Sequence, residues 1–170
     1  MKRDNRIIRR CLQVFILCLV LSGLTAIPLE TELKFLIGHF PFDGSIKGWL
    51  QEVLLAVQQT HKDYPYLFYG YDWLAFAHFI LAILFIGPLM QPVKNKWIIE
   101  FGIIASVLVI PFALVAGQFR GIPFWWRLAD CSFAIAGLVP LVICLQRIKM
   151  LEKEEKQELE RKHNYDLLVA

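Results

Sequence analysis

Residues 97–117 read WIIEFGIIASVLVIPFALVAG, a run whose one charged residue is Glu100. An α-helix rises about 1.5 Å per residue, so roughly 20 apolar residues cross the ~30 Å hydrocarbon core of a bilayer. Three further stretches of comparable length and composition cover residues 11–29, 73–91 and 124–146. The sequence therefore predicts an all-α fold, an integral membrane four-helix bundle.

The distribution of charge supports lipid as the surroundings of most of the chain. Apolar residues make up 57% of the sequence and charged residues 19%. The charged residues gather at the N-terminus, in segment 30–63, at 94–96 and after Arg147, whereas a soluble helix carries them along its whole length. We expect a membrane domain over residues 1–146 and a charged tail over 147–170. The net charge of +3 is too small to indicate a nucleic-acid partner.

Lysine and arginine predict the orientation, because they are enriched in cytoplasmic segments. Thirteen of the eighteen lie before the first span, between the second and third, or after the fourth. The prediction is a multi-pass protein of the inner membrane with both termini in the cytoplasm and the loop 30–72 outside. The basic start also fits a signal peptide, but Leu24 stands where a small residue is expected before a cut at Ala26. We therefore expect a retained first span.

Segment 46–60 of the outer loop has the apolar spacing of an amphipathic helix. Its apolar positions are Ile46, Trp49, Leu50, Val53, Leu54 and Val57. Ser45 is a plausible N-cap. Such a helix lies flat on the bilayer or covers the bundle, and the alternatives are a substrate gate or a docking element for a partner.

Two further patterns concern packing and the tail. In span three, the small residues Gly102 and Ser106, and likewise Ala113 and Gly117, are spaced for close helix contacts. Residues 147–163 are rich in helix-forming side chains, so we expect them to extend span four as a solvated helix.

Cysteine and histidine give no sign of a metal or another cofactor. The four cysteines, Cys11, Cys18, Cys131 and Cys144, form no Cys-x-x-Cys pair. His39 and His61 have no cysteine or carboxylate at metal-ligand spacing. We expect no disulfide framework and no bound metal.

Ionisable residues within the spans mark the candidate site, because such groups are costly in a bilayer and usually face the bundle or water. His78 lies six residues after Asp72, and Asp130 lies six after Phe124, so each sits about 9 Å below the outer end of its span. A contact between His78 and Asp130 is therefore predicted. Three more side chains are expected to complete an outward-facing polar cluster with Asp72: Arg127, Gln118 and Arg120.

The cluster has alternative interpretations. In a purely structural role, Arg127 pairs with Asp130 three residues later on the same helix, and His78 hydrogen-bonds across helices. Alternatively the cluster binds a ligand, a proton or an ion. In a third interpretation His78 is a catalytic base that Asp130 orients.

Two segments, GYDWLAFAHF at 70–79 and GIPFWWRLADCSF at 121–133, resemble a family of small bacterial membrane proteins without an assigned activity. The resemblance covers spans two to four. It implies a component of a bacterial inner membrane and nothing about a reaction.

The leading hypothesis for function is a non-enzymatic accessory or regulatory subunit that binds a protein partner through the outer loop or the tail. It is motivated by the lack of a nucleophile–base set, a metal cluster or a phosphate-binding loop. One alternative is an ion- or proton-coupled carrier that uses the polar cluster. The other is a membrane-embedded enzyme acting on a lipid or a quinone.

Overall fold

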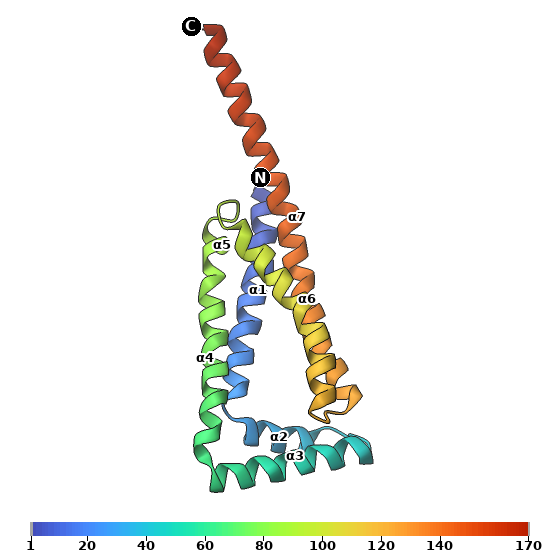
Figure 1. Ribbon diagram of the computed structural model, residues 1–170. Coiled ribbons are helices and arrows are strands. Elements are labelled where there is room, and N and C mark those ends of the chain that lie inside the picture. Colours follow the sequence, from blue (N-terminus) through green and yellow to red (C-terminus); the bar gives the residue numbers. More distant parts are fainter. Residues whose placement is uncertain (1, 170) are drawn as a thin grey trace. The chain divides into compact units, whose positions relative to one another are not determined.

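The computed structural model describes residues 2–169, and all regular structure in this range is helical (Figure 1). The all-α prediction is thereby confirmed. In chain order the elements are α1 (Lys2–Ala26), α2 (Leu29–His39), α3 (Gly44–Asp63), the 3₁₀ helix η1 (Pro65–Phe68), α4 (Tyr69–Leu84), α5 (Ile86–Met90), α6 (Lys96–Phe119) and α7 (Phe124–Val169).

The chain forms two compact units, which are described separately. Unit 1 contains the chain up to Ile16 and from Ile83 onward, and unit 2 is Leu17–Ala82. Helices α1 and α4 each contribute to both units.

Four helical stretches are long and apolar enough to cross a membrane: Asp4–Ala26, Pro65–Met90, Lys96–Phe119 and Phe124–Tyr165. They correspond to the four predicted spans and indicate a multi-pass membrane protein. Many of their apolar side chains are exposed on the chain itself, among them Leu108, Phe112 and Phe133. Lipid is the surroundings in which such exposure is favourable.

Prolines end the first predicted span early and interrupt the second. Helix α1 ends at Ala26 rather than at residue 29, because a residue that precedes a proline, here Ile27 before Pro28, disfavours helical backbone angles. The second span is divided into α4 and α5 at Phe85. Pro88 lacks an N–H, and its ring would clash with the carbonyl of Leu84, so an uninterrupted helix is not favoured there.

Helix α2 was not predicted, since the sequence analysis treated residues 30–45 as loop. A signal for it exists in the chain. Glu30 and Lys34 are four residues apart and form an ion pair of 2.6 Å on one helix face.

Glycine allows close helix packing in unit 1, where α6 runs beside the first part of α7 (Figure 1). A Cβ placed on Gly102 would lie 2.7 Å from Phe85 and 2.9 Å from Leu141. Gly102 is buried, and the Ser106 hydroxyl donates to its carbonyl oxygen at 2.9 Å. The predicted packing role of the Gly102 and Ser106 pair is confirmed.

In unit 1 the first helix contacts the middle of the last helix. The Phe15 and Phe85 rings lie 4.7 Å apart, and the Cys144 thiol donates to the Ile8 carbonyl at 3.7 Å. An ion pair of 3.1 Å joins Arg147 of α7 to Asp4 of α1. The last two of these contacts bring together residues that are more than 130 positions apart, so packing rather than local propensity determines them.

The turn between α6 and α7 is a Schellman motif. Gly121 has φ +68°, and its N–H donates to the Gln118 carbonyl. The Ile122 N–H donates to the Gly117 carbonyl at 2.9 Å. These bonds satisfy carbonyls that the end of a helix leaves without partners. The turn sends α7 back along α6 and places Arg127 opposite Gly117.

In unit 2, α2 and α3 pack side by side (Figure 1). They lie across the C-terminal end of α1 and the N-terminal end of α4. Leu33 of α2 and Leu50 of α3 are buried, which confirms the apolar side predicted for the amphipathic helix. The Glu30 carboxylate accepts a hydrogen bond from Gln58 of α3 at 2.9 Å. The two helices thus share an apolar contact and a polar one.

The N-cap of α3 is Asp43 and not Ser45 as predicted. The Asp43 carboxylate accepts from the Ile46 N–H at 2.9 Å, and the Ser45 hydroxyl donates to the same carboxylate oxygen. Ser45 lies within the first turn, two residues after the N-cap position. These bonds lower the pKa of Asp43, the bond from Ile46 being the largest cause.

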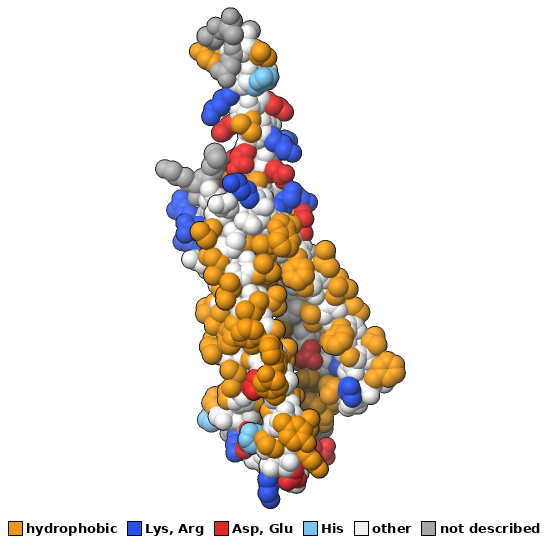
Figure 2. Space-filling view, turned by 60° about the vertical axis from the view of Figure 1, so that its left-hand side comes forward, with side chains coloured by type: hydrophobic (Ala, Val, Ile, Leu, Met, Phe, Trp, Pro, Cys, Tyr) orange, Lys and Arg blue, Asp and Glu red, His pale blue; other side chains and the backbone are white. Residues whose placement is uncertain are grey.

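Helix α7 continues well beyond the predicted span. Its 46 residues extend about 69 Å at 1.5 Å per residue, more than twice the hydrocarbon core. The predicted helical tail is confirmed over the described residues. On the face shown in Figure 2, charged side chains surround this part of α7, whereas hydrophobic side chains cover the helices of the spans.

Candidate functional site

Arg127 is the cluster residue with the most specific surroundings. It belongs to the second turn of α7, and its side chain crosses to α6, where the Nη1 atom donates to the Leu114 carbonyl at 3.1 Å. Its stem lies against Gly117, since a Cβ there would come within 2.6 Å of Arg127 Cγ. The guanidinium carbon is 5.3 Å from the centre of the Phe124 ring, within the range of a cation–π interaction.

The predicted local ion pair between Arg127 and Asp130 is absent from the described residues. The guanidinium is drawn instead toward α6, because Gly117 leaves space for its stem and the Leu114 carbonyl accepts its proton. Arg127 Nε is buried and has no hydrogen-bond partner in the described part of the chain. This N–H is therefore an unused hydrogen-bonding group of the side chain. Leaving a buried donor unsatisfied costs about 1–3 kcal/mol.

Asp130 lies one turn further along α7 and is partly exposed. Within residues 2–169 its carboxylate forms no ion pair or hydrogen bond. Gln118 and Arg120 lie at the end of α6 and are exposed. Gln118, Arg120, Arg127 and Asp130 therefore all belong to unit 1, near the turn between α6 and α7.

His78 belongs to unit 2, on the side of α4 that meets α1. Gly23 of α1 makes this contact possible, because a Cβ there would lie 3.0 Å from the Ala75 carbonyl oxygen and 3.2 Å from His78 Cβ. The Nδ1 atom of His78 is 2.7 Å from the Leu74 carbonyl oxygen. Because a carbonyl only accepts, Nδ1 is the donor of this bond, and Nε2 is left for a second hydrogen bond.

His78 and Asp130 thus belong to different units, and their predicted contact stays a prediction. The same holds for Asp72, which lies in α4 of unit 2. The structure groups the six candidate residues into a set of four and a set of two.

Asp72 lines a cavity of about 340 Å³ in unit 2, which the sequence analysis did not predict. The walls come from the link between α1 and α2, from the start of α2, from α3, from η1 and from the start of α4. Glu30, His61, Phe68 and Tyr71 line it with Asp72. No sequence pattern marks this cavity, because its lining residues are spread from Ile27 to Asp72.

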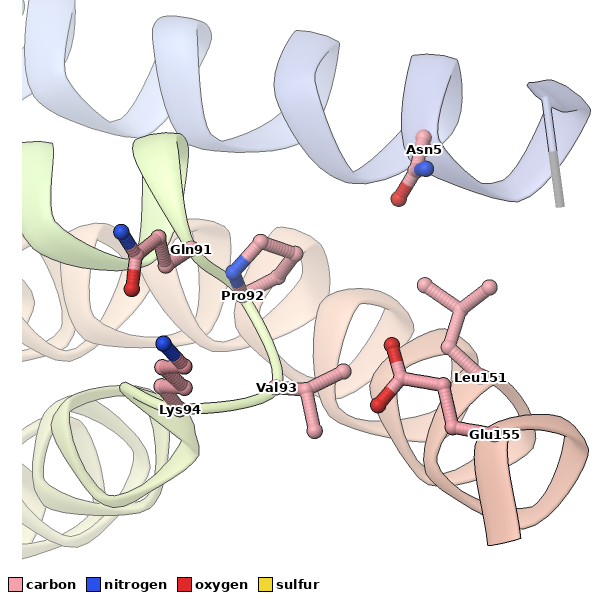
Figure 3. A pocket seen from close by; sticks show the side chains of 7 residues that line it. All are labelled: Asn5, Gln91, Pro92, Val93, Lys94, Leu151 and Glu155. Carbon is pink, nitrogen blue, oxygen red and sulfur yellow. The ribbon is translucent and has the colours of Figure 1, made fainter. Parts of the chain in front are cut away.

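A second cavity, also of about 340 Å³, lies in unit 1 at the opposite end of α6 from Arg127 (Figure 3). Asn5 of α1, Gln91 and Lys94 of the α5–α6 turn, and Leu151 and Glu155 of α7 line it. The α5–α6 turn is held by Asn95, whose amide donates to the Gly87 and Gln91 carbonyls. Lys96 anchors it to α7 through an ion pair of 2.8 Å with Glu152.

No group of three or more histidine, cysteine, aspartate or glutamate side chains in the described chain is arranged to hold a metal ion. The structure does bring Cys11 and Cys144 together as neighbouring thiols, and Cys144 is fully buried. Sequence analysis missed this proximity, because the two residues lie on the first and last helices.

Comparisons with known proteins identify no relative: no family model, no curated protein and no solved structure matches the chain. The resemblance of residues 70–79 and 121–133 to small bacterial membrane proteins stays an expectation.

Chemically, the four-residue set in unit 1 offers an arginine with a spare donor and a carboxylate that has no partner among the described residues. The set in unit 2 offers a histidine whose Nε2 is open to a further hydrogen bond. In a low-dielectric medium an isolated carboxylate is unfavourable, so Asp130 requires a proton, a cation or a hydrogen-bond donor.

Proposed function

We propose that this multi-pass membrane protein lies in a bacterial inner membrane. There it would be a non-enzymatic accessory or regulatory subunit that acts by binding a protein partner. The observation that carries the proposal is the α7 extension, defined as residues 147–169. A helix needs about 20 residues to cross a bilayer, and α7 has 46. Half of the helix is therefore available outside the membrane.

Among the side chains that the structure describes, the buried ones of the α7 extension lie in its first part. Ile148 and Leu151 are buried, and Glu152 pairs with Lys96. Further along, Leu159 is 66% exposed and Tyr165 is 67% exposed. Helices in proteins owe most of their stability to tertiary packing, so a partner that covers these side chains would stabilise the extension.

The proposed orientation places the α7 extension in the cytoplasm, as the lysine and arginine bias favours. This orientation is tested with two reporters, alkaline phosphatase and green fluorescent protein. Each is fused to the C-terminus or inserted in the α2–α3 link. We expect fluorescence at the C-terminus and phosphatase activity at the link. Phosphatase activity at the C-terminus would reverse the orientation.

Association is tested by photocrosslinking in cells. A photoreactive amino acid at position 159 or 165 is expected to give one discrete protein adduct, whereas the same group at Val139, an exposed position within the span, is expected to give none. The partner should copurify in fixed ratio with the full chain and not with a chain that ends at Gln157. Equal copurification with the shortened chain would exclude the α7 extension as the contact.

A carrier for protons or other ions is the second candidate, and the unpartnered Asp130 carboxylate favours it. In that case Asp130→Asn abolishes flux in proteoliposomes while the protein still inserts, and Asp63→Asn, outside the spans, leaves flux unchanged. Wild-type flux in Asp130→Asn rejects the carrier.

The alternative of an enzyme for a lipid or a quinone depends on His78 as the base. A defined turnover by purified protein that is lost in His78→Ala would replace the accessory role. Unchanged turnover in that variant would assign the reaction to another group.

A further inference from the structure

The cavity in unit 2 lies where two spans end. Ile27, Pro28 and Leu29 follow the span that closes at Ala26, and Pro65 opens the next one. The cavity is therefore at the boundary between the hydrocarbon core and water. Its volume of about 340 Å³ is sufficient for a small ligand or a lipid headgroup.

Two carboxylates, those of Glu30 and Asp72, belong to the lining, and no lysine or arginine is among the lining residues that the structure describes. Lys34, which does not line the cavity, forms an ion pair of 2.6 Å with Glu30, so Asp72 is the lining carboxylate whose charge no described cation offsets. Lys34 and Gln58 both donate to Oε1 of Glu30, which leaves Oε2 without a partner in the described chain. Asp72 forms no described hydrogen bond or ion pair and is exposed. Acceptor oxygens of both carboxylates are thus available, and the charge of Asp72 favours a cation.

Aromatic rings form part of the wall. The Phe68 and Tyr71 rings are stacked with centroids 5.8 Å apart, and the His61 ring meets Phe68 at 5.1 Å and an angle of 62°. The face of a phenylalanine or tyrosine ring attracts an organic ammonium group. Val57 and the two prolines add apolar surface to the lining. Such a surface does not suit a metal ion, because the ion holds its water strongly and prefers oxygen ligands.

We propose that this cavity binds an organic ammonium group, with Asp72 and Glu30 as the anionic contacts and Phe68 and Tyr71 as the aromatic ones. Two sources of that group fit the position at the membrane boundary. One is the amine of an ethanolamine phospholipid headgroup, and the other is a free amine from the aqueous side.

Native mass spectrometry of the full chain in detergent micelles tests the proposal. The probes are phosphatidylethanolamine, phosphatidylglycerol and ethanolamine itself. We expect phosphatidylethanolamine to bind at least tenfold more tightly than phosphatidylglycerol, which shares its phosphate and acyl chains but lacks the ammonium. Asp72→Asn should reduce that preference about tenfold.

Two further variants separate recognition from folding. Phe68→Leu keeps an apolar side chain and removes the aromatic face, so it should also weaken ammonium binding. Glu52→Gln removes an exposed carboxylate of α3 that does not line the cavity, and it should leave binding unchanged. Circular dichroism and gel filtration establish that each variant is folded.

The source of the ammonium follows from the ethanolamine titration. Binding of ethanolamine to lipid-free protein, with loss in Asp72→Asn, supports a free amine. Binding of the phospholipid without binding of ethanolamine supports a headgroup site. The proposal is overturned if neither probe binds in preference to phosphatidylglycerol, or if Asp72→Asn and Phe68→Leu both keep the wild-type preference. These outcomes do not depend on the protein partner proposed for the α7 extension.

Discussion

At Gly117 the lack of a side chain decides where Arg127 lies. A methyl group there would come within 2.5 Å of Arg127 Cδ, in the middle of the arginine stem, so the side chain would have to leave the Leu114 carbonyl. We expect Gly117→Ala to destabilise the protein and Arg127→Ala to suppress much of that loss. A double-mutant cycle, followed by chemical denaturation in micelles, should give a coupling of about 0.5–3 kcal/mol. Additive effects would show that the two residues do not depend on each other.

Gly121 illustrates a different requirement at the residue scale, that of the backbone. Its φ of +68° is unfavourable for an L side chain, yet a Cβ there would contact nothing within 4 Å. Gly121→Ala should therefore reduce the free energy of unfolding by about 1–2 kcal/mol for conformational reasons alone. Gly121→Asn should lose less, because asparagine tolerates this region. An equal loss in both variants would point to a cause other than the backbone angle.

At the scale of elements, the pair α2 and α3 depends on a carboxylate that titrates. The hydrogen bond from Lys34, followed by that from Gln58, holds the pKa of Glu30 below its ordinary value of 4.5. A lowered folded-state pKa means that the charged carboxylate stabilises the fold fully above pH 4.5, and that this contribution is lost as the pH falls through the lowered pKa.

Glu30→Gln should therefore be less stable than the wild type near neutral pH, and the difference should shrink at a pH well below 4.5. Denaturation of both proteins at the two pH values measures it. Lys34→Gln serves as a matched variant, because it removes the main cause of the lowered pKa. A difference between wild type and Glu30→Gln that is the same at both pH values would contradict the assignment.

At the scale of the whole molecule, unit 1 joins the first helix to the last. The thiols of Cys11 and Cys144 are neighbours within it. Oxidation with copper phenanthroline in membranes should therefore link them, leaving two of the four thiols open to maleimide after denaturation. In Cys11→Ser all three remaining thiols should react. Four reactive thiols in the oxidised wild type would show that α1 and α7 do not pack as described.

The sequence by itself determined the helical class and the four spans, because long apolar runs leave the backbone no partners in lipid other than its own carbonyls. It also located the packing glycines at 102 and 117, since small residues at helical spacing are a local signal. Single prolines explain why the first span ends early, before Pro28, and why the second span is interrupted, before Pro88. The effect of a proline on the preceding turn is also local.

Only the tertiary structure decided which side chains meet. Arg127 bonds to Leu114 instead of Asp130, because the choice depends on the space that Gly117 leaves on another helix. The cavity around Asp72 and Glu30, and the proximity of Cys11 to Cys144, likewise join residues far apart in the chain. Such contacts arise from packing between helices. The apolar periodicity of a sequence predicts which face of a helix packs, but it does not predict which residues of two helices meet.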